Sequence, residues 1–374
     1  MNYTHAPYPV VECRLDILRE NVKNITDRCH ADGITVAGVM KGINGHMPLV
    51  HQFDKGGCDQ IASSRLEQLF EVKKAGITKP TLLLRIPMMC EIPNVVQLCD
   101  VTLVSEIATM DALNEECEKQ GKKIKVIVMV DLGDLREGFW DRAELVEACA
   151  HIENDLKNLE LAGVGTNLGC YGSIQPTVEK MEELIEAAEM VEAKIGRQLE
   201  WISGGATSSY VMVNDGTMPK RINHLRIGEN ILLARDLQTD WGIDTMGYLR
   251  MDVFTLKAQV IEVKDKPSHP VGKIFMDAFG NFPTYTDRGI RKRALLGVGK
   301  LDLGAIEKLL PKAEGIEVLG GSSDHTILDV EDFKGEMKVG DLVEFDLCYA
   351  TMLFLTSCKS VSLRYFDGDQ EVFE

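Results

Sequence analysis

The amino-acid sequence predicts an α/β fold: a TIM (β/α)8 barrel followed by a C-terminal, mainly antiparallel β domain. From about residue 15 to 238, eight strand-like runs alternate with helical stretches, the pattern of βα units around a parallel sheet. Beyond that point, β-type segments are separated by Gly, Pro and Asp turns, as in antiparallel sheets. We therefore expect the barrel at residues 15–238 and the β domain at residues 239–374, and the strand-like segment 1–14 could pair with the β domain.

The helices of the barrel are predicted from apolar residues that recur with a period near 3.6. The first is expected at residues 15–29, and the clearest at 177–196, where Pro176 lies near the start and Gly196 marks the end. The eight strands are near-continuously apolar, as parallel strands covered on both faces are. They are expected at residues 34–41, 60–65, 81–86, 101–106, 125–132, 161–167, 200–205 and 224–228.

A doubly wound open sheet would give a similar alternation, so counting strands does not exclude it. However, no GxGxxG motif lies between a strand and a helix, and the glycines of residues 163–169 (GVGTNLG) have the wrong spacing. This absence favours the barrel. In the second domain, strands are expected at residues 253–263, 293–304, 326–330, 341–347 and 360–366.

Composition and charge exclude several classes of function. The net charge of −17 argues against nucleic acid, whose phosphates require basic patches. No apolar run approaches the roughly 18–20 residues that span a bilayer, and the N-terminus lacks the features of a signal peptide. The ten cysteines are scattered without a CxxC pair, and the histidines form no metal-binding motif. We therefore expect a cytoplasmic protein with reduced thiols, no membrane partner and no metal.

Lys41 is the first candidate for chemistry, because it ends a strand that the pattern predicts to be buried. A buried ammonium loses much of its hydration free energy. It therefore requires an ionic partner such as Glu106, a shifted pKa, or a covalent attachment. A side chain that reaches back to solvent is the plainer alternative.

Other polar residues occur at the carboxyl ends of the predicted strands, where TIM barrels carry their active sites. Arg136 follows the fifth strand, Asn167 ends the sixth, and Arg226 lies in the eighth. The turn after the seventh strand contains Gly205, Thr207 and Ser208, and its N–H groups could bind a phosphate, although an ordinary helix N-cap has the same composition. A lysine, a phosphate-binding turn and an arginine together suggest pyridoxal 5'-phosphate as the cofactor.

With these residues identified, the whole chain resembles the alanine racemase family of fold type III pyridoxal-phosphate enzymes, and most of all its ornithine racemase branch. Residues 38–46 (GVMKGINGH) are similar to the family's lysine motif, and residues 130–139 (VDLGDLREGF) to its Asp-Thr-Gly-Met-x-Arg-x-Gly stretch. Residues 224–232 (HLRIGENIL) resemble the Val-Arg-Pro-Gly segment. Residues 320–330 and 348–365 resemble segments of the family's β domain.

This resemblance implies a role for each matching residue. Lys41 would be the lysine that forms the imine with the cofactor, Arg136 would contact the cofactor's phenolic oxygen and the substrate, and Arg226 would bond the pyridine nitrogen. Gly228 and Glu229 would offer phosphate-binding amides. The β domain would contribute Tyr349 to the phosphate, and Ser323 and Asp324 to the substrate carboxylate.

The chain departs from the family's pattern at three positions. Lys300 stands where the family has a catalytic tyrosine, Asn167 replaces a histidine, and Met129 replaces a lysine that is often carbamylated. Racemisation requires a base on each face of the reacting carbon. Lys41 would serve one face, and Lys300, Tyr349, another group or water would serve the other. Lys300 could equally be a surface lysine in a turn.

The predicted function is therefore a pyridoxal-phosphate-dependent amino-acid racemase that interconverts L- and D-isomers through a Cα carbanion, in a homodimer with shared active sites. Ornithine or another cationic amino acid is favoured, and alanine or broad specificity remains possible. Acids that could bind a cationic side chain are Asp134, Asp277, Asp302 and Asp324. The alternatives are a decarboxylase or aldolase of the same fold, a non-catalytic pyridoxal-phosphate-binding protein, and a barrel enzyme that uses Lys41 without this cofactor.

Overall fold

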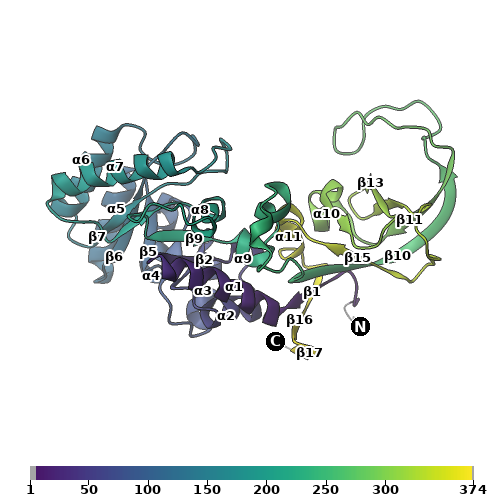
Figure 1. Cartoon of the computed structure of the whole chain (residues 1–374), viewed down its shortest axis with the longest axis horizontal. Coiled ribbons are helices and arrows are strands. Elements are labelled where there is room, and N and C mark those ends of the chain that lie inside the picture. Colours follow the sequence, from purple (N-terminus) through teal and green to yellow (C-terminus); the bar gives the residue numbers. More distant parts are fainter. Residues whose placement is uncertain (1–5, 373–374) are drawn as a thin grey trace. The chain divides into compact units, whose positions relative to one another are not determined.

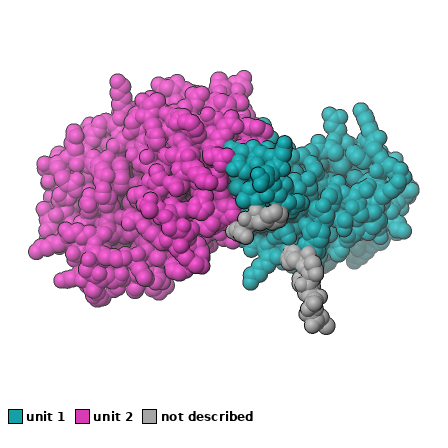
Figure 2. Space-filling view, turned by 90° about the horizontal axis from the view of Figure 1, so that it is seen from below, with its two compact units in different colours: residues 1–16, 251–374 teal, residues 17–250 magenta. Residues whose placement is uncertain are grey.

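The computed structural model describes residues 6–372, and the chain divides into two compact units. One unit, the barrel, is Ile17–Arg250, and the other, the β domain, combines the residues up to Asp16 with those from Met251 onward (Figures 1 and 2). The barrel unit thus extends beyond the expected boundary at residue 238. The side chain of Asn21 bonds to the backbone of Arg250 in both directions, at 2.7 and 2.8 Å, which ties this segment to the first barrel helix.

Among the described residues, eight parallel strands close into a barrel, which confirms the predicted fold. The barrel closes because β9 pairs with β2, with Ala37 opposite Arg226. The strands are β2 (Thr35–Val39), β3 (Gln60–Ser63), β4 (Thr81–Leu83), β5 (Val101–Val104), β6 (Ile124–Met129), β7 (Leu159–Gly165), β8 (Trp201–Ser203) and β9 (His224–Ile227). The helices are α1 (Leu15–Ala31), α2 (Met47–Lys55), α3 (Leu66–Lys74), α4 (Ile92–Leu98), α5 (Ile107–Gln120), α6 (Arg142–Asp155), α7 (Val178–Ile195), α8 (Tyr210–Asn214) and α9 (Glu229–Leu232).

Helix α7 illustrates how local sequence sets the helix ends. The Thr177 side chain accepts a hydrogen bond from the Lys180 backbone at the N-cap, and Gly196 takes a left-handed conformation at the C-cap. An N-cap hydroxyl satisfies a backbone donor that has no partner within the helix, and glycine adopts a left-handed φ without steric cost. The predicted helix at residues 177–196 is found within these limits.

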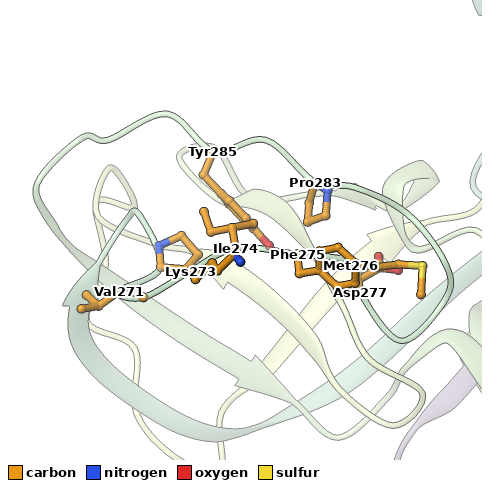
Figure 3. A pocket seen from close by; sticks show the side chains of 10 residues that line it. Val271, Lys273, Ile274, Phe275, Met276, Asp277, Pro283 and Tyr285 are labelled. Carbon is orange, nitrogen blue, oxygen red and sulfur yellow. The ribbon is translucent and has the colours of Figure 1, made fainter.

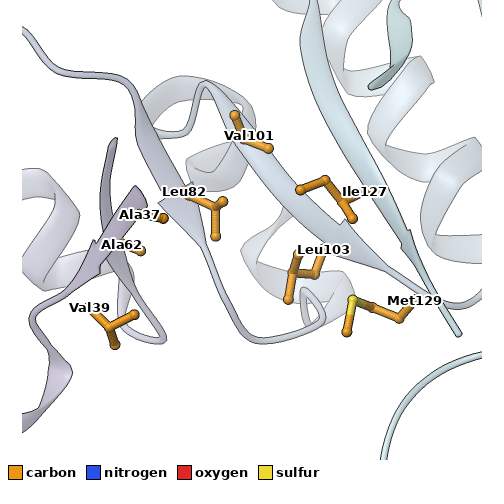
Figure 4. Close-up of a cluster of buried hydrophobic side chains, with 8 residues drawn as sticks. All are labelled: Ala37, Val39, Ala62, Leu82, Val101, Leu103, Ile127 and Met129. Atoms are coloured by element: carbon orange, nitrogen blue, oxygen red, sulfur yellow. The ribbon is translucent and has the colours of Figure 1, made fainter. Parts of the chain in front are cut away.

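The interior of the barrel is filled by alternate residues of its strands. A buried apolar cluster comes from β2 to β6 and comprises Ala37, Val39, Ala62, Leu82, Val101, Leu103, Ile127 and Met129 (Figure 4). The strand register extends the same inward-facing set to Gln60, Ser203, His224 and Arg226, because each is paired with a member of this set or lies two residues from one. The buried polar side chains of this set therefore come from β8, β9 and β3.

The second unit contains a mainly antiparallel sheet, as predicted. Strand β1 (Val10–Arg14), from the N-terminal segment, pairs antiparallel with β10 (Phe254–Pro267) and parallel with β16 (Ser362–Asp367). The other strands are β11 (Ile290–Leu296), β12 (Leu310–Pro311), β13 (Glu317–Gly321), β14 (Thr326–Asp329), β15 (Leu342–Asp346) and β17 (Gln370–Val372).

Two short helices interrupt this sheet, α10 (Lys300–Leu303) and α11 (Tyr349–Leu355). The expected strand at residues 293–304 was wrong in its second half, where the chain turns into α10. The Asp302 carboxylate accepts a 3.0 Å hydrogen bond from the Gly299 backbone and stabilises the helical turn. Gly304 then ends the helix with a φ of 65°.

Two general observations apply to residues 6–372. None of their helices is long and apolar enough to cross a bilayer. All ten cysteines lie in this range and are free, and six of them are buried, where a thiol packs like a small apolar side chain.

Candidate functional site

Lys41 lies directly beyond the carboxyl end of β2, in a short 3-10 turn of residues Lys41–Ile43. Asn44 follows in the left-handed conformation with a φ of 47°, and its backbone N–H donates to the Lys41 carbonyl. Asparagine tolerates this conformation better than most residues. The turn therefore reverses the chain at once and leaves the lysine at the open end of the barrel.

The Lys41 side chain reaches solvent, but the protein atoms around it still desolvate its ammonium. Desolvation is the main cause that lowers the pKa of Lys41, and the charges of Arg136 and Arg226 lower it further against the opposing effects of Cys170 and Glu137. Within residues 6–372, no side chain forms a hydrogen bond or ion pair with its amine. More of the amine is therefore neutral near pH 7 than in an ordinary lysine.

Arg226 lies inside the barrel with 3% of its surface exposed. Its guanidinium donates to the Ser203 hydroxyl through Nη1 and to the Thr166 carbonyl through Nη2, at 2.6 Å for the second bond. Burial lowers the pKa of Arg226 to about 10. The charge of Glu137 raises this pKa and the charge of Arg136 lowers it, each by less than burial does. The group is still a cation at neutral pH, because a guanidinium retains its proton in proteins.

The turns after β8 and β9 form one connected structure. The Thr207 hydroxyl accepts hydrogen bonds from the backbone N–H groups of Gly228 and Asn230, at 3.3 and 3.4 Å. Gly205 has a φ of 116°, and its carbonyl accepts from the Arg226 backbone at 2.9 Å. The Ser208 hydroxyl donates to the Leu168 carbonyl at 3.0 Å. Four of the residues predicted from sequence are thus brought together here: Gly205, Thr207, Ser208 and Gly228.

Several buried polar atoms near these turns have no hydrogen-bond partner among the described residues. They include Thr166 Oγ1 and Asn167 Nδ2 after β7, and both side-chain polar atoms of Asn230. An unsatisfied buried polar atom costs roughly 1–3 kcal/mol. Such atoms at the end of a TIM barrel suggest that this site binds a polar ligand.

Glu229 begins α9 and is 7% exposed. Its Oε1 atom accepts hydrogen bonds from the backbone N–H groups of Arg235 and Asp236, each at 3.1 Å. Burial raises the pKa of Glu229 to about 7, and the nearby Asp236 carboxylate adds to this shift. The carboxyl group thus stabilises the turn that follows α9.

Arg136 lies in the loop after β6, where it forms a bidentate ion pair with its neighbour Glu137. Glu137 was not predicted, although its charge acts on both Lys41 and Arg226. Asp134 is 2% exposed and accepts hydrogen bonds from the backbone of Cys170, Tyr171 and Ile174. It therefore joins the loops after β6 and β7 and has little capacity left for a substrate side chain.

In the β domain, the predicted residues Lys300, Ser323 and Asp324 lie on adjoining segments. The backbone N–H groups of Lys300 and Leu301 donate to the carbonyls of Ser322 and Ser323 at 2.9 and 3.0 Å. The Ser323 hydroxyl donates to Asp324 at 2.6 Å. The Lys300 amine lies 4.1 Å from the centre of the Phe279 ring, a cation–π contact.

Tyr349, also predicted, is the first residue of α11. This helix packs on α10, since a Cβ added at Gly304 would lie 2.3 Å from the Phe354 ring, and the Cys358 thiol donates to Asp302 at 3.1 Å. Lys300 and Tyr349 thus begin two neighbouring helices of the same domain. Asp302 is used in this contact and in capping α10.

A surface depression in the β domain is formed by one loop, residues 270–285 (Figure 3). Its lining is mostly apolar and includes Ile274, Phe275, Met276 and Tyr285, with Lys273 and Asp277 as charged residues. The Asp277 carboxylate accepts from the backbone of Phe279 and Asn281, so it shapes this loop. None of the residues predicted to bind a cofactor lines this depression, and residues 6–372 contain no cluster of three or more His, Cys, Asp or Glu side chains suited to a metal ion.

Gln60, Ser203 and His224 were not predicted from the sequence, although hydrogen bonds connect all three side chains to Arg226. A signal was present, because His224 and Arg226 are two residues apart in a strand and so face the same side. Ser203 and Gln60 interrupt otherwise apolar strands in the same way. Their convergence on Arg226 depends on the closure of the barrel.

Comparison with known proteins places this geometry in a family. Residues 13–235 match the family described as "Alanine racemase, N-terminal domain". The chain is 40% identical over 346 residues to ornithine racemase of Acetoanaerobium sticklandii, which covers 92% of this chain and 96% of that relative. It is 38% identical over 346 residues to lysine racemase of Thermotoga maritima, with coverage of 92% and 95%.

Among solved structures, alanine racemase of Clostridium difficile 630 has the same fold, with a TM-score of 0.75 at 20% identity, covering 99% of this chain and 98% of that chain. The expected resemblance is confirmed by the family match and by the two relatives of nearly equal length. This chain belongs to the alanine racemase family of amino-acid racemases.

Proposed function

We propose that this protein racemises a cationic amino acid, with ornithine or lysine as the substrate and pyridoxal 5'-phosphate as the cofactor. The observation that carries the proposal is Lys41, an amine of lowered pKa and without a hydrogen-bond partner among the described residues, at the end of β2 in a barrel that holds Arg226. The relatives that are 40% and 38% identical are named ornithine racemase and lysine racemase. They support the substrate class.

The residues at the end of the barrel fit this cofactor. Gly228 packs tightly on β2, because an added Cβ would lie 3.0 Å from the Val39 side chain. At Gly205 an added Cβ would lie 2.7 Å from the Ser209 hydroxyl, and the φ of 116° is strained for any other residue. These two glycines let the turns after β8 and β9 pack closely on their neighbours, at the position that the proposal gives to the phosphate. The unpartnered atoms of Thr166 and Asn167 supply further polar contacts.

In this proposal the residues divide the binding as follows. Lys41 would hold the cofactor through its aldehyde, Arg226 would bind the ring nitrogen, and Arg136 would bind the phenolic oxygen and the substrate carboxylate. The phosphate would be held by Gly205, Thr207, Ser208, Gly228 and the backbone of Glu229, and Asn167 would offer a polar contact to the cofactor. When bound, pyridoxal phosphate withdraws electrons from the amino acid and makes its Cα proton more acidic.

Racemisation moves the Cα proton off one face and returns a proton to the other, so one residue must accept and another must donate. Lys41 is suited to accept a proton because its lowered pKa increases the neutral fraction. Arg226 retains its own proton and does not donate it. It therefore presents a fixed positive charge rather than an acid.

We further propose that Lys300 serves the opposite face, with Tyr349 as the alternative, and that a second copy of this chain supplies it in a homodimer. The β domain holds Lys300 beside Ser323 and Asp324, and Asp277 and Phe279 of the 270–285 loop lie near its amine. Exposed apolar side chains in that loop, Phe275 and Phe282, indicate a surface that a partner covers. Light scattering tests the dimer, and a fully active monomer would exclude it.

The main test is chiral chromatography of the cofactor-loaded enzyme with L-ornithine, L-lysine and L-alanine. We expect the D-isomer of ornithine or lysine to form, a yellow absorbance band of the bound cofactor, and loss of both in Lys41→Ala. Release of CO₂ or of an aldehyde in place of the D-isomer would instead support a decarboxylase or an aldolase. Binding of the cofactor without turnover would support a non-catalytic protein.

The two roles of base are separated by isotope exchange at Cα in D₂O. If Lys300 serves one face, Lys300→Met should exchange the proton of one enantiomer and not of the other, and Tyr349→Phe should retain both. The reverse result would assign the role to Tyr349. We also propose a reducing, cytoplasmic location, which the ten free thiols support.

A further inference from the structure

We propose that Ser203, His224 and Gln60 form a hydrogen-bond relay that positions the Arg226 guanidinium, with His224 as a neutral imidazole at its centre. The relay deepens the proposed function and rests on it for its catalytic consequence. Its geometry is given by the hydrogen bonds inside the barrel and does not depend on the proposed function. Within residues 6–372, none of the three side chains forms a hydrogen bond with the residues that surround the phosphate in the proposal above, so they are positioning residues.

The four side chains are connected in a line across the interior of the barrel. Arg226 Nη1 donates to Ser203 Oγ, Ser203 Oγ lies 2.7 Å from His224 Nδ1, and His224 Nε2 lies 3.1 Å from Gln60 Oε1. Ser203 and His224 are 0% exposed, and Gln60 and Arg226 are 3% exposed. Water therefore has little access to any of these hydrogen bonds, which strengthens them.

The chemistry of the groups fixes the direction of each hydrogen bond. A guanidinium only donates, so Ser203 Oγ accepts from Arg226. The Ser203 proton is then directed to His224 Nδ1, which must be unprotonated, and Nε2 carries the ring proton to Gln60 Oε1. In the opposite tautomer Ser203 would accept two hydrogen bonds, and its own proton would have no acceptor among residues 6–372.

The surroundings of His224 favour its neutral form. Burial is the main cause that lowers the pKa of His224, to about 3, and the positive charge of Arg226 adds to it. The Trp201 ring packs beside the imidazole, with a centroid distance of 5.2 Å and an interplanar angle of 35°. A protonated His224 would place two cations on either side of one hydroxyl group.

The relay explains how a buried arginine is held without a carboxylate. Arg226 forms hydrogen bonds with the hydroxyl of Ser203 and the carbonyl of Thr166, which come from β8 and from the residue after β7. Within the described residues no carboxylate bonds to it. Two neutral acceptors, one on β8 and one directly after β7, set the plane of the guanidinium and leave its positive charge undiminished by a bonded anion. A carboxylate in place of Ser203 would share that charge and weaken its effect on a ring nitrogen.

The first experiment examines the tautomer of His224 in the cofactor-free protein. Long-range ¹H–¹⁵N NMR at pH 7 on protein labelled in histidine distinguishes a protonated from an unprotonated ring nitrogen. We expect Nδ1 of His224 to be unprotonated and Nε2 to carry the proton, with a change in the Nδ1 shift in Ser203→Ala. An imidazolium, or a proton on Nδ1, would overturn the relay. The signal is assigned by its loss in His224→Asn, or through bonds in the parent protein if that variant does not fold.

The second experiment compares variants of the cofactor-loaded enzyme with L-ornithine. Ser203→Ala and His224→Leu should each lower kcat about tenfold with KM changed less than about twofold, because the contact is lost at the reacting ring and not at the substrate. The double variant should lose no more than about tenfold, since residues that act as one unit are not additive. His224→Asn keeps an acceptor toward Ser203 and should recover most of the loss.

Thr26→Val is the matched control. Thr26 is 1% exposed, and its hydroxyl donates to the Gly56 carbonyl at 2.9 Å, away from the relay. A hundredfold loss of kcat in the double variant, which two independent tenfold effects would give, would overturn the relay. A tenfold loss of kcat in Thr26→Val, equal to that of Ser203→Ala, would overturn it as well. If the parent enzyme racemises no amino acid, the proposed function is wrong. The NMR measurement of the His224 tautomer still tests the relay in that case. The wrong tautomer in an active racemase would overturn the relay alone.

Discussion

The two sides of the barrel interior differ in what they contain. On β4, β5 and β6 the buried inward-facing residues are large and apolar, among them Leu82, Leu103 and Ile127 (Figure 4). On β8, β9, β2 and β3, which are contiguous around the barrel, Ser203, His224, Arg226 and Gln60 face inward. We call these the apolar side and the polar side.

The difference indicates a division of labour within one set of strands. The apolar side loses water from large side chains, which contributes about 25 cal/mol for each Å² buried. The polar side gains little from burial, because each polar atom must first be desolvated and then hydrogen-bonded. Small residues beside it, Ala37 and Ala62, leave room for the arginine. The polar side therefore serves the chemistry at the open end of the barrel, and the apolar side supplies its stability.

The largest test of this division is Lys41→Ala, at the end of β2. We expect racemisation to fall at least about 10³-fold, because a positioned proton acceptor is lost, while the free energy of unfolding stays the same or rises slightly. Removal of a desolvated amine costs the fold nothing. Polarimetry and urea unfolding measure the two quantities. Lys41→Arg keeps the charge but cannot accept a proton, so activity retained in that variant would contradict the role.

The apolar side is tested by Leu103→Ala. Leu103 is 1% exposed, and deletion of a buried leucine costs about 3 kcal/mol through lost transfer energy and a cavity. The activity of the folded fraction should change less than about threefold, the opposite of the Lys41 result. All three tryptophans, Trp140, Trp201 and Trp241, lie in the barrel unit. Their fluorescence therefore reports the unfolding of the barrel, and a loss of activity without a loss of stability would refute the division.

Arg226→Gln tests the polar side at its centre. We expect kcat to fall about 10²-fold, the usual cost of one preorganised electrostatic contact, because an amide does not supply the positive charge. Arg226→Lys keeps a charge but not the planar fork, and should lose less. Equal activity in both variants and the parent enzyme, measured by chiral chromatography, would show that Arg226 has only a structural role.

Much of this organisation was predictable from sequence, for a physical reason. Parallel strands must alternate with helices, and their carboxyl ends meet at one end of a barrel. Reading only the strand ends therefore selected Lys41, Asn167 and Arg226, which the structure places at that end or just inside it. The match to the family spans residues 13–235 and so includes all three positions.

Other features were not predictable, because they depend on closure and register. Gln60 and His224 are distant in sequence and meet only because β9 closes on β2 next to β3. Helix α10 replaced an expected strand, since a single carboxylate, that of Asp302, caps a turn too short to show helical periodicity. Arg136 and Glu137 are neighbours in a loop, where no periodicity specifies the direction of a side chain. Their ion pair was therefore not predictable.

The smallest expected effect concerns Glu229, where the polar side continues into α9. Burial raises the pKa of this carboxyl from 4.5 to about 7, and Asp236 adds to the shift. Between these two values the folded state holds more protons than the unfolded state, so the free energy of unfolding should fall as pH rises from 4.5 through 7.

Glu229→Gln removes that titration. Since each pKa unit corresponds to about 1.4 kcal/mol, the parent protein should lose about 1–3 kcal/mol over this range relative to the variant. Tryptophan fluorescence during urea unfolding at several pH values measures the difference. Asp236→Asn removes the neighbouring charge and should reduce the slope without abolishing it. Parallel curves for the parent protein and Glu229→Gln would mean that Glu229 is ionised in the fold, and that the polar side tolerates a buried carboxylate as readily as it tolerates Arg226.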